Sequence, residues 1–181
     1  MRDTSRFRDS LWPAPIEMVV VLAILGVLVG VMAPGIRAYI RRARTAEAVV
    51  NLDRIALGAR TYFLAEHPNP SGGSPLARQF PNSVGPTPST ACAIQVGSRC
   101  AGGDPGWTSA SWYALHFSME HRHYYYYDFA SAGLDTAATF TTNARGDLDG
   151  DTVITTFSRS GSVNIQNDVD VSPMTIVEEN E

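Results

Sequence analysis

The 181-residue sequence lacks the motifs of several large enzyme classes, and it lacks an excess of positive charge. It contains no glycine-rich phosphate loop, no nucleophile elbow and no cysteine–histidine pair at a spacing typical of catalysis. The formal net charge of −4 gives no indication of nucleic-acid binding. We therefore predict a protein that is not an enzyme and has no nucleic-acid partner.

Charge is also missing from one long segment near the N-terminus. No side chain from Met18 to Ile36 is charged, which is about the ~20 apolar residues that a membrane-spanning helix needs. The segment is longer than a secretory h-region and no small-residue cleavage site follows it, so we predict a retained anchor. Glu17 stands just before the segment. A carboxylate is costly in a bilayer, so we expect Glu17 to have a polar partner, with a solvated interfacial glutamate as the alternative.

This segment resembles the N-terminal segment of type IV pilins and of type II secretion pseudopilins. The shared pattern is a glutamate, a run of small and branched apolar residues, a proline seventeen residues later (Pro34), a tyrosine (Tyr39) and an arginine-rich helix. The resemblance covers Ile16 to about His67. It implies a structural subunit of a type IV pilus-like filament, in which Glu17 and Pro34 serve assembly and Glu17 pairs with the terminal amine of a neighbouring subunit.

The resemblance also implies partners and a location. The partners are other subunits in a homopolymer or mixed filament, the inner membrane, the pilus assembly machinery and a prepilin peptidase that cleaves the leader and methylates the new N-terminus. The subunit would be a single-pass inner-membrane protein with a periplasmic head, and part of a cell-surface filament after assembly. Such filaments serve adhesion, twitching motility, DNA uptake or secretion. A type II secretion pseudopilin and a membrane-tethered binding module that never polymerises are the alternatives.

The leader departs from the family pattern, which has glycine and phenylalanine where this chain has Trp12 and Pro13. Glycine lets a backbone lie flat in a protease cleft, whereas proline fixes φ and removes an N–H group. Cleavage between Trp12 and Pro13 is therefore disfavoured. Two interpretations stay open: an altered pilin-like chain with impaired or unusual processing, and a true subunit cut by a tolerant peptidase.

We predict a pilin-like α+β fold, with a long N-terminal helix packed on an antiparallel β-sheet of three or four strands. The predicted parts are a leader (1–12), the helix (13–67, with its transmembrane and assembly segment at 18–36), a loop between helix and sheet (68–111) and a sheet head (112–181). The helix should end at His67, because the residue before a proline is disfavoured in the α region. After Pro34, apolar residues recur at three- and four-residue steps, which predicts a buried stripe of Ile36, Ile40, Ala43, Ala48, Leu52, Ile55, Ala59, Tyr62 and Phe63.

Short runs rich in aromatic and β-branched residues follow from Trp112 and predict strands. They are WYALHF, HYYYYDFAS, AATFTTNAR, TVITTFSRSG and SVNIQNDV. Alternation along a strand would bury two of the four tyrosines at 124–127 and expose the other two. It would also place His121 and His123 on one face, where they lack an evident third ligand for zinc.

Cysteine is scarce, since Cys92 and Cys100 are the only two. They have seven residues between them in a segment rich in Gly, Ser and Pro. This predicts a disulfide formed in an oxidising periplasm, with two reduced thiols as the alternative. The arginines oppose a periplasmic head, because four of them follow the apolar segment and three precede it. The disulfide would constrain the loop by roughly 2–3 kcal/mol.

The segment GDLDGD places Asp147, Asp149 and Asp151 at alternate positions. Calcium prefers several oxygen ligands, and an EF-type loop begins with such a pattern. However, Thr152 stands where the loop glycine belongs, and Ser158 replaces the glutamate at the twelfth position. Asp-Gly is also a strong turn former. We favour a hairpin turn without a cofactor and keep a bound Ca²⁺ as the alternative.

Overall fold

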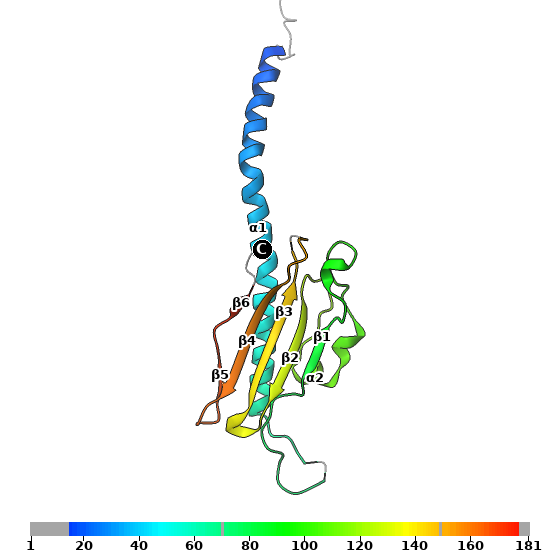
Figure 1. Cartoon of the computed structure of the whole chain (residues 1–181), viewed down its shortest axis with the longest axis vertical. Helices are drawn as coiled ribbons and strands as arrows, with labels where there is room; N and C mark the ends of the chain where they lie inside the picture. The colour runs from blue at the N-terminus through cyan, green and yellow to red at the C-terminus, as the bar shows by residue number, and fades with distance from the viewer. Residues whose placement is uncertain (1–14, 70, 149, 178–181) are drawn as a thin grey trace, which may run out of the picture. The chain divides into compact units, whose positions relative to one another are not determined.

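The computed structural model describes residues 15–69, 71–148 and 150–177. The chain divides into two compact units, Met1–Ile40 and Arg41–Glu181. The described part of the first unit is helical, and the second unit contains the described strands (Figure 1). The architecture is therefore α+β, with an apolar N-terminal helix and an antiparallel sheet, which confirms the predicted fold class at that level.

Helix α1 covers Pro15–Leu64 and continues through Pro34. It ends three residues before the predicted stop at His67. The His67 ring stacks on Tyr62 with 4.1 Å between ring centroids, and its Nε2 lies 3.0 Å from the Tyr62 carbonyl oxygen. The same Tyr62 carbonyl oxygen accepts from the Ala65 N–H at 3.2 Å, so a backbone group and the histidine ring both contact the last turn of the helix.

The buried stripe of α1 starts later than the sequence predicts. Ile36 and Ile40 are 56% and 42% exposed, and Ala43 is exposed as well, so the first third of the predicted stripe is wrong. From Ala48 the stripe is confirmed, although Tyr62 is only half-buried. The fully buried members are Ala48, Leu52, Ile55, Ala59 and Phe63. Apolar spacing alone does not show where along a helix the covering sheet begins.

The sheet has six strands within the described residues, so the prediction of three or four strands was wrong. The strands are β1 (Val84–Thr87), β2 (Tyr126–Ala132), β3 (Thr139–Gly146), β4 (Thr155–Val163), β5 (Val169–Val171) and β6 (Thr175–Val177). Their order is β1-β2-β3-β4-β5, every pairing is antiparallel, and β6 also pairs with β4. Strand β4 is long enough to pair with β6 near its start and with β5 at its end.

The two extra C-terminal strands have only three residues each, too few for an alternating pattern to stand out. The predicted strand SVNIQNDV is divided by a turn, because Val163 ends β4 and Val169 begins β5. Asn164 holds this turn, since its Oδ1 accepts hydrogen bonds from the backbone N–H groups of Gln166 and Asp168, both at 3.0 Å. Local side-chain hydrogen bonds of this kind favour turns over strands.

The core of the second unit lies between the sheet and the part of α1 from Arg41 onward, which crosses one sheet face (Figure 1). Alternation is clear in β3, where Phe140, Thr142 and Ala144 are buried. At the start of β4, Thr155 and Phe157 are likewise buried. The α1 stripe meets these side chains in a single hydrophobic cluster.

The segment predicted as a surface loop at 68–111 supplies part of this core. Phe80 and Trp107 are 3% and 5% exposed, and β1 adds an edge strand to the sheet. Short 3-10 helices form at Cys92–Ile94 (η1) and Pro105–Thr108 (η2), and a third follows at Asp135–Ala137 (η3). Parts of this segment are therefore buried and regular, while the rest of its described residues form loops.

The run WYALHF forms no strand. Helix α2 (Ala110–Ala114) occupies its first part, with Ser109 as N-cap and its Oγ accepting from the Trp112 N–H at 3.5 Å. Trp112 is fully buried, and its Nε1 donates to Thr87 Oγ1 at 2.9 Å. A capping serine and a partner elsewhere in the chain thus outweigh the β-propensity of the aromatic residues.

Of the four consecutive tyrosines, Tyr125 and Tyr127 are fully buried, as alternation predicts. Tyr124 and Tyr126 are half-buried rather than exposed. The expected pairing of His121 with His123 on one strand face was wrong, because both precede β2 and only His123 is buried.

Candidate functional site

The described part of the first unit contains a long run of exposed apolar side chains. Residues Pro15–Met32 have a mean hydropathy of 2.5, and none of this window is buried within the protein. Eighteen helical residues extend ~27 Å, close to the ~30 Å hydrocarbon core of a bilayer. One N-terminal helix is therefore long and apolar enough to span a membrane.

Glu17 lies exposed in the first turn of α1. A negative charge there interacts favourably with the positive end of the helix dipole. The other predicted assembly residue, Pro34, is helical within α1. The predicted cleavage residues Trp12 and Pro13 lie outside the described residues.

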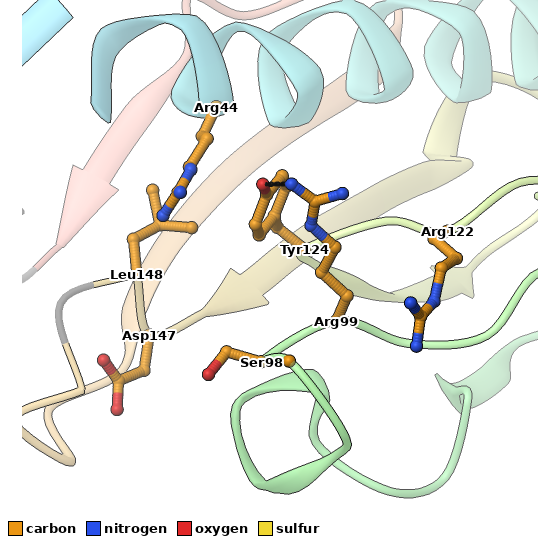
Figure 2. Close-up of a pocket in the computed structure, with 8 residues that line it drawn as sticks. Arg44, Ser98, Arg99, Arg122, Tyr124, Asp147 and Leu148 are labelled. Carbon is orange, nitrogen blue, oxygen red and sulfur yellow. Dashed lines mark hydrogen bonds between the residues drawn. The ribbon is translucent and has the colours of Figure 1, made fainter. Parts of the chain in front are cut away.

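The second unit holds a polar hollow that sequence reasoning missed. Its volume is about 440 Å³. Figure 2 shows the Tyr124 ring between the side chains of Arg44, from α1, and Arg99, from the loop after η1. The guanidinium carbons of these arginines lie 4.8 and 4.4 Å from the ring centroid, within the range of cation–π interactions. Arg99 also donates to the Tyr124 hydroxyl.

Glu47 of α1 holds Tyr124 in place through a hydrogen bond to its backbone. It lies one turn after Arg44 on α1, and its Oε1 accepts from the Tyr124 backbone N–H at 3.0 Å and from the Tyr127 hydroxyl at 3.4 Å. Burial raises the pKa of Glu47, and the backbone N–H groups of Tyr124 and Tyr125 partly oppose that rise. One face of α1 thus fixes both the arginine and the aromatic ring that it contacts.

The hollow carries a local positive charge on an acidic protein. Arg44, Arg99 and Arg122 line it together with Asp147. The salt bridges found among the described residues are Arg60–Asp168, Arg145–Asp128 and Arg159–Asp53, so none uses a lining arginine. Every basic side chain in the sequence is arginine, whose planar guanidinium can hold an oxyanion through two parallel hydrogen bonds. The hollow therefore suits an anionic group.

Two of the three carboxylates considered for calcium, Asp147 and Asp151, lie in the described residues between β3 and β4. Asp147 is buried, and its two oxygens accept from the backbone N–H groups of Gly150 at 2.6 Å and Thr152 at 3.0 Å. Asp151 accepts from the Val153 N–H at 2.7 Å. Asp149 lies outside the described residues. The two described carboxylates thus bind backbone, as the turn interpretation predicts, and calcium binding stays a prediction.

The predicted disulfide is present, since Cys92 and Cys100 are bonded and both are buried. His123 lies beside the bond, with a ring nitrogen and the two sulfur atoms within 4.8 Å of one another. Burial lowers the pKa of His123, against the opposing effect of its hydrogen bond to the His121 carbonyl, and this favours the neutral ring. The sequence paired His123 with His121, whereas the structure pairs it with the cysteines.

The chain was compared with protein-family models, curated proteins and solved structures, and none of them matched it. The functional argument therefore rests on the residues themselves.

The hollow was missed because its parts are far apart in the sequence. Arg44 belongs to a helix, Arg99 to the disulfide loop, and Tyr124 to the approach to β2. No spacing rule connects them. The one available signal was that the sequence has arginine and no lysine, which does not show where a site lies.

Proposed function

We propose that this chain is the structural subunit of a type IV pilus-like filament, held in the inner membrane by the first part of α1 before assembly. The observation that carries the proposal is the apolar window Pro15–Met32, none of which is buried within the protein. Each large apolar side chain gains about 1.5–3 kcal/mol when it leaves water, so a surface of this size requires a partner. Lipid can cover it before assembly, and other subunits can cover it afterwards.

Small residues on this surface support helix–helix packing. A Cβ atom added at Gly26 or Gly30 would have nothing within 4 Å in this chain, so both positions are open to a neighbouring helix. Because lipid removes the hydrophobic drive between helices, their association depends on close approach at such residues. Glu17, at the start of this surface, would set the register by pairing with the terminal amine of the neighbouring subunit.

The assembly role of Glu17 is tested in a bacterium that carries a pilus assembly machinery. Glu17→Ala should abolish incorporation into sheared filaments, while the Cys92–Cys100 disulfide and the head stay intact. Glu66→Ala, which removes an exposed carboxylate near the end of α1, is the matched control and should assemble normally. Filament yield that is equal in the two variants would contradict the register role.

A second candidate is a membrane-tethered binding module that never polymerises. The arginine-lined hollow around Tyr124 favours it, because three guanidinium groups line it and none of them belongs to a salt bridge found among the described residues. Mass spectrometry of the N-terminus separates the two candidates. A mature chain that starts near Pro13 with a methylated amine supports a filament subunit, and retention of Met1 to Trp12 supports the tethered module.

A further inference from the structure

His123 is fully buried, and only one of its two ring nitrogens has a hydrogen-bond partner among the described residues. Its Nδ1 lies 2.9 Å from the His121 carbonyl oxygen. A carbonyl only accepts, so Nδ1 carries the proton and the neutral ring presents a lone pair on Nε2. Nε2 is buried and has no hydrogen-bond partner among the residues that the structure describes. Most buried polar atoms are paired, so an atom left over in this way requires an explanation.

The sulfur atoms of Cys92 and Cys100 lie close to the His123 ring. A ring nitrogen of His123 and the two Sγ atoms lie within 4.8 Å of one another. Cys100 and His123 form an isolated antiparallel β-bridge, with backbone N···O distances of 2.8 and 3.3 Å. Residues directly opposite each other in such a pair project to the same side. The backbone therefore holds the imidazole beside the sulfurs.

Two thiolates and one imidazole are a typical ligand set for zinc. Zinc bonds of 2.0–2.3 Å in a tetrahedron place ligand atoms ~3.5–3.8 Å apart, so side-chain rotation after the disulfide opens would suffice. The Nδ1–H group bonded to a backbone carbonyl matches the supporting contact that orients most metal-binding histidines. Cys92 also lines a cavity of about 130 Å³ together with Ile94 and Tyr126.

We propose that the dithiol form of this chain binds one Zn²⁺ ion through Cys92, Cys100 and His123, and that the metal and the disulfide are alternative states of one site. The newly made chain carries both thiols before the disulfide forms. A dithiol reductant regenerates them by exchange, in which the protein disulfide takes up two electrons and two protons and the reductant becomes a disulfide. Zinc then displaces the two thiol protons and accepts the Nε2 lone pair. Neither state depends on filament assembly.

The test uses the full chain in detergent, reduced with a phosphine and titrated with Co²⁺ as a spectroscopic substitute for zinc. We expect one equivalent to produce cobalt–thiolate charge-transfer and tetrahedral d–d absorption, which Zn²⁺ then displaces. The disulfide form should show neither band. Zinc should also raise the Tm of the reduced chain and leave that of the disulfide form unchanged.

His123→Ala and His121→Ala form the matched pair. His121→Ala keeps the backbone carbonyl and should bind cobalt as the parent chain does. His123→Ala should weaken binding at least ~100-fold, since even the loss of a supporting contact costs 10- to 100-fold. Near-UV circular dichroism of the disulfide form checks that each variant is folded. If His123→Ala is not folded, His123→Gln, which fills more of the site, replaces it.

Absence of the thiolate band in the reduced parent chain would overturn the proposal. Equal cobalt affinity in the His121 and His123 variants would overturn it as well, because the two cysteines would then act alone.

Discussion

The two parts of α1 both carry large apolar side chains, but these side chains have opposite surroundings. Leu22 in the first part is 62% exposed, and Leu52 in the second part is fully buried. The second part alternates apolar and polar residues with a helical period, so one face meets the sheet. The first part has no charged side chain from Met18 to Ile36, so its apolar residues are not confined to one face. The second part packs on the sheet of the head, and we propose that lipid or other subunits cover the first part.

The strongest way to break this comparison is to make the same substitution in both parts. Leu52→Ala removes a fully buried side chain and should cost the head about 2–5 kcal/mol of unfolding free energy. Leu22→Ala should leave the head unchanged and should instead weaken association between subunits. Urea unfolding of the full chain in detergent, followed by the fluorescence of buried Trp107 and Trp112, measures the stability of the head in both variants. A stable head in the Leu52 variant would contradict the assigned core.

Glycine gives a second, smaller contrast. A Cβ atom at Gly58 would lie 2.1 Å from the Leu115 carbonyl oxygen, where helix α2 ends against α1. Gly58→Ala should therefore cost about 1–3 kcal/mol, because backbone must move to make room. Gly30→Ala meets nothing within 4 Å and should not change the head. The same urea measurement compares the two variants, and equal midpoints would mean that α2 does not approach α1 so closely.

The smallest expected effect concerns the ion pair between Arg60, in the second part of α1, and Asp168. Arg60 of α1 donates to both carboxylate oxygens of Asp168, at 2.9 and 3.0 Å. The Val169 N–H, and then Arg60, lower the pKa of Asp168 from its ordinary 3.8. A lowered carboxyl pKa adds stability that is present above the ordinary value and is lost as the pH falls through the folded value. The pair is exposed, so the gain is small.

Asp168→Asn should therefore lower the Tm slightly at about pH 6 and leave it almost unchanged at about pH 2. Glu66→Gln, which changes an exposed carboxylate, serves as the control for general charge effects. An equal loss of Tm at both pH values would show that the amide acts through packing and that the charge of Asp168 contributes nothing.

The sequence predicted those features that depend on neighbours along the chain. The long helix, the main strands and the Cys92–Cys100 bond follow from periodicity, β-propensity and spacing. It failed where distant residues decide. Trp112 is helical because Ser109 caps the turn and Thr87 accepts a hydrogen bond from the indole. The strand propensity of a residue does not include contacts of this kind.

The candidate sites divide in the same way. The apolar surface that follows Glu17 could be read directly from composition. The hollow around Tyr124 and the proximity of His123 to two cysteines both depend on how the disulfide loop packs beside the start of β2. No local sequence pattern predicts such a contact. Loops positioned by a sheet commonly carry such sites.

The central claim is that the first part of α1 is covered by lipid before assembly. A photoreactive amino acid at Leu25 or at Leu57 tests it most directly, since the two side chains are 51% and 65% exposed on the same helix. In liposomes that contain the full chain, the probe at Leu25 should cross-link to phospholipid and the probe at Leu57 should not. Lipid adducts that are absent at Leu25, or equally frequent at both positions, would contradict the account.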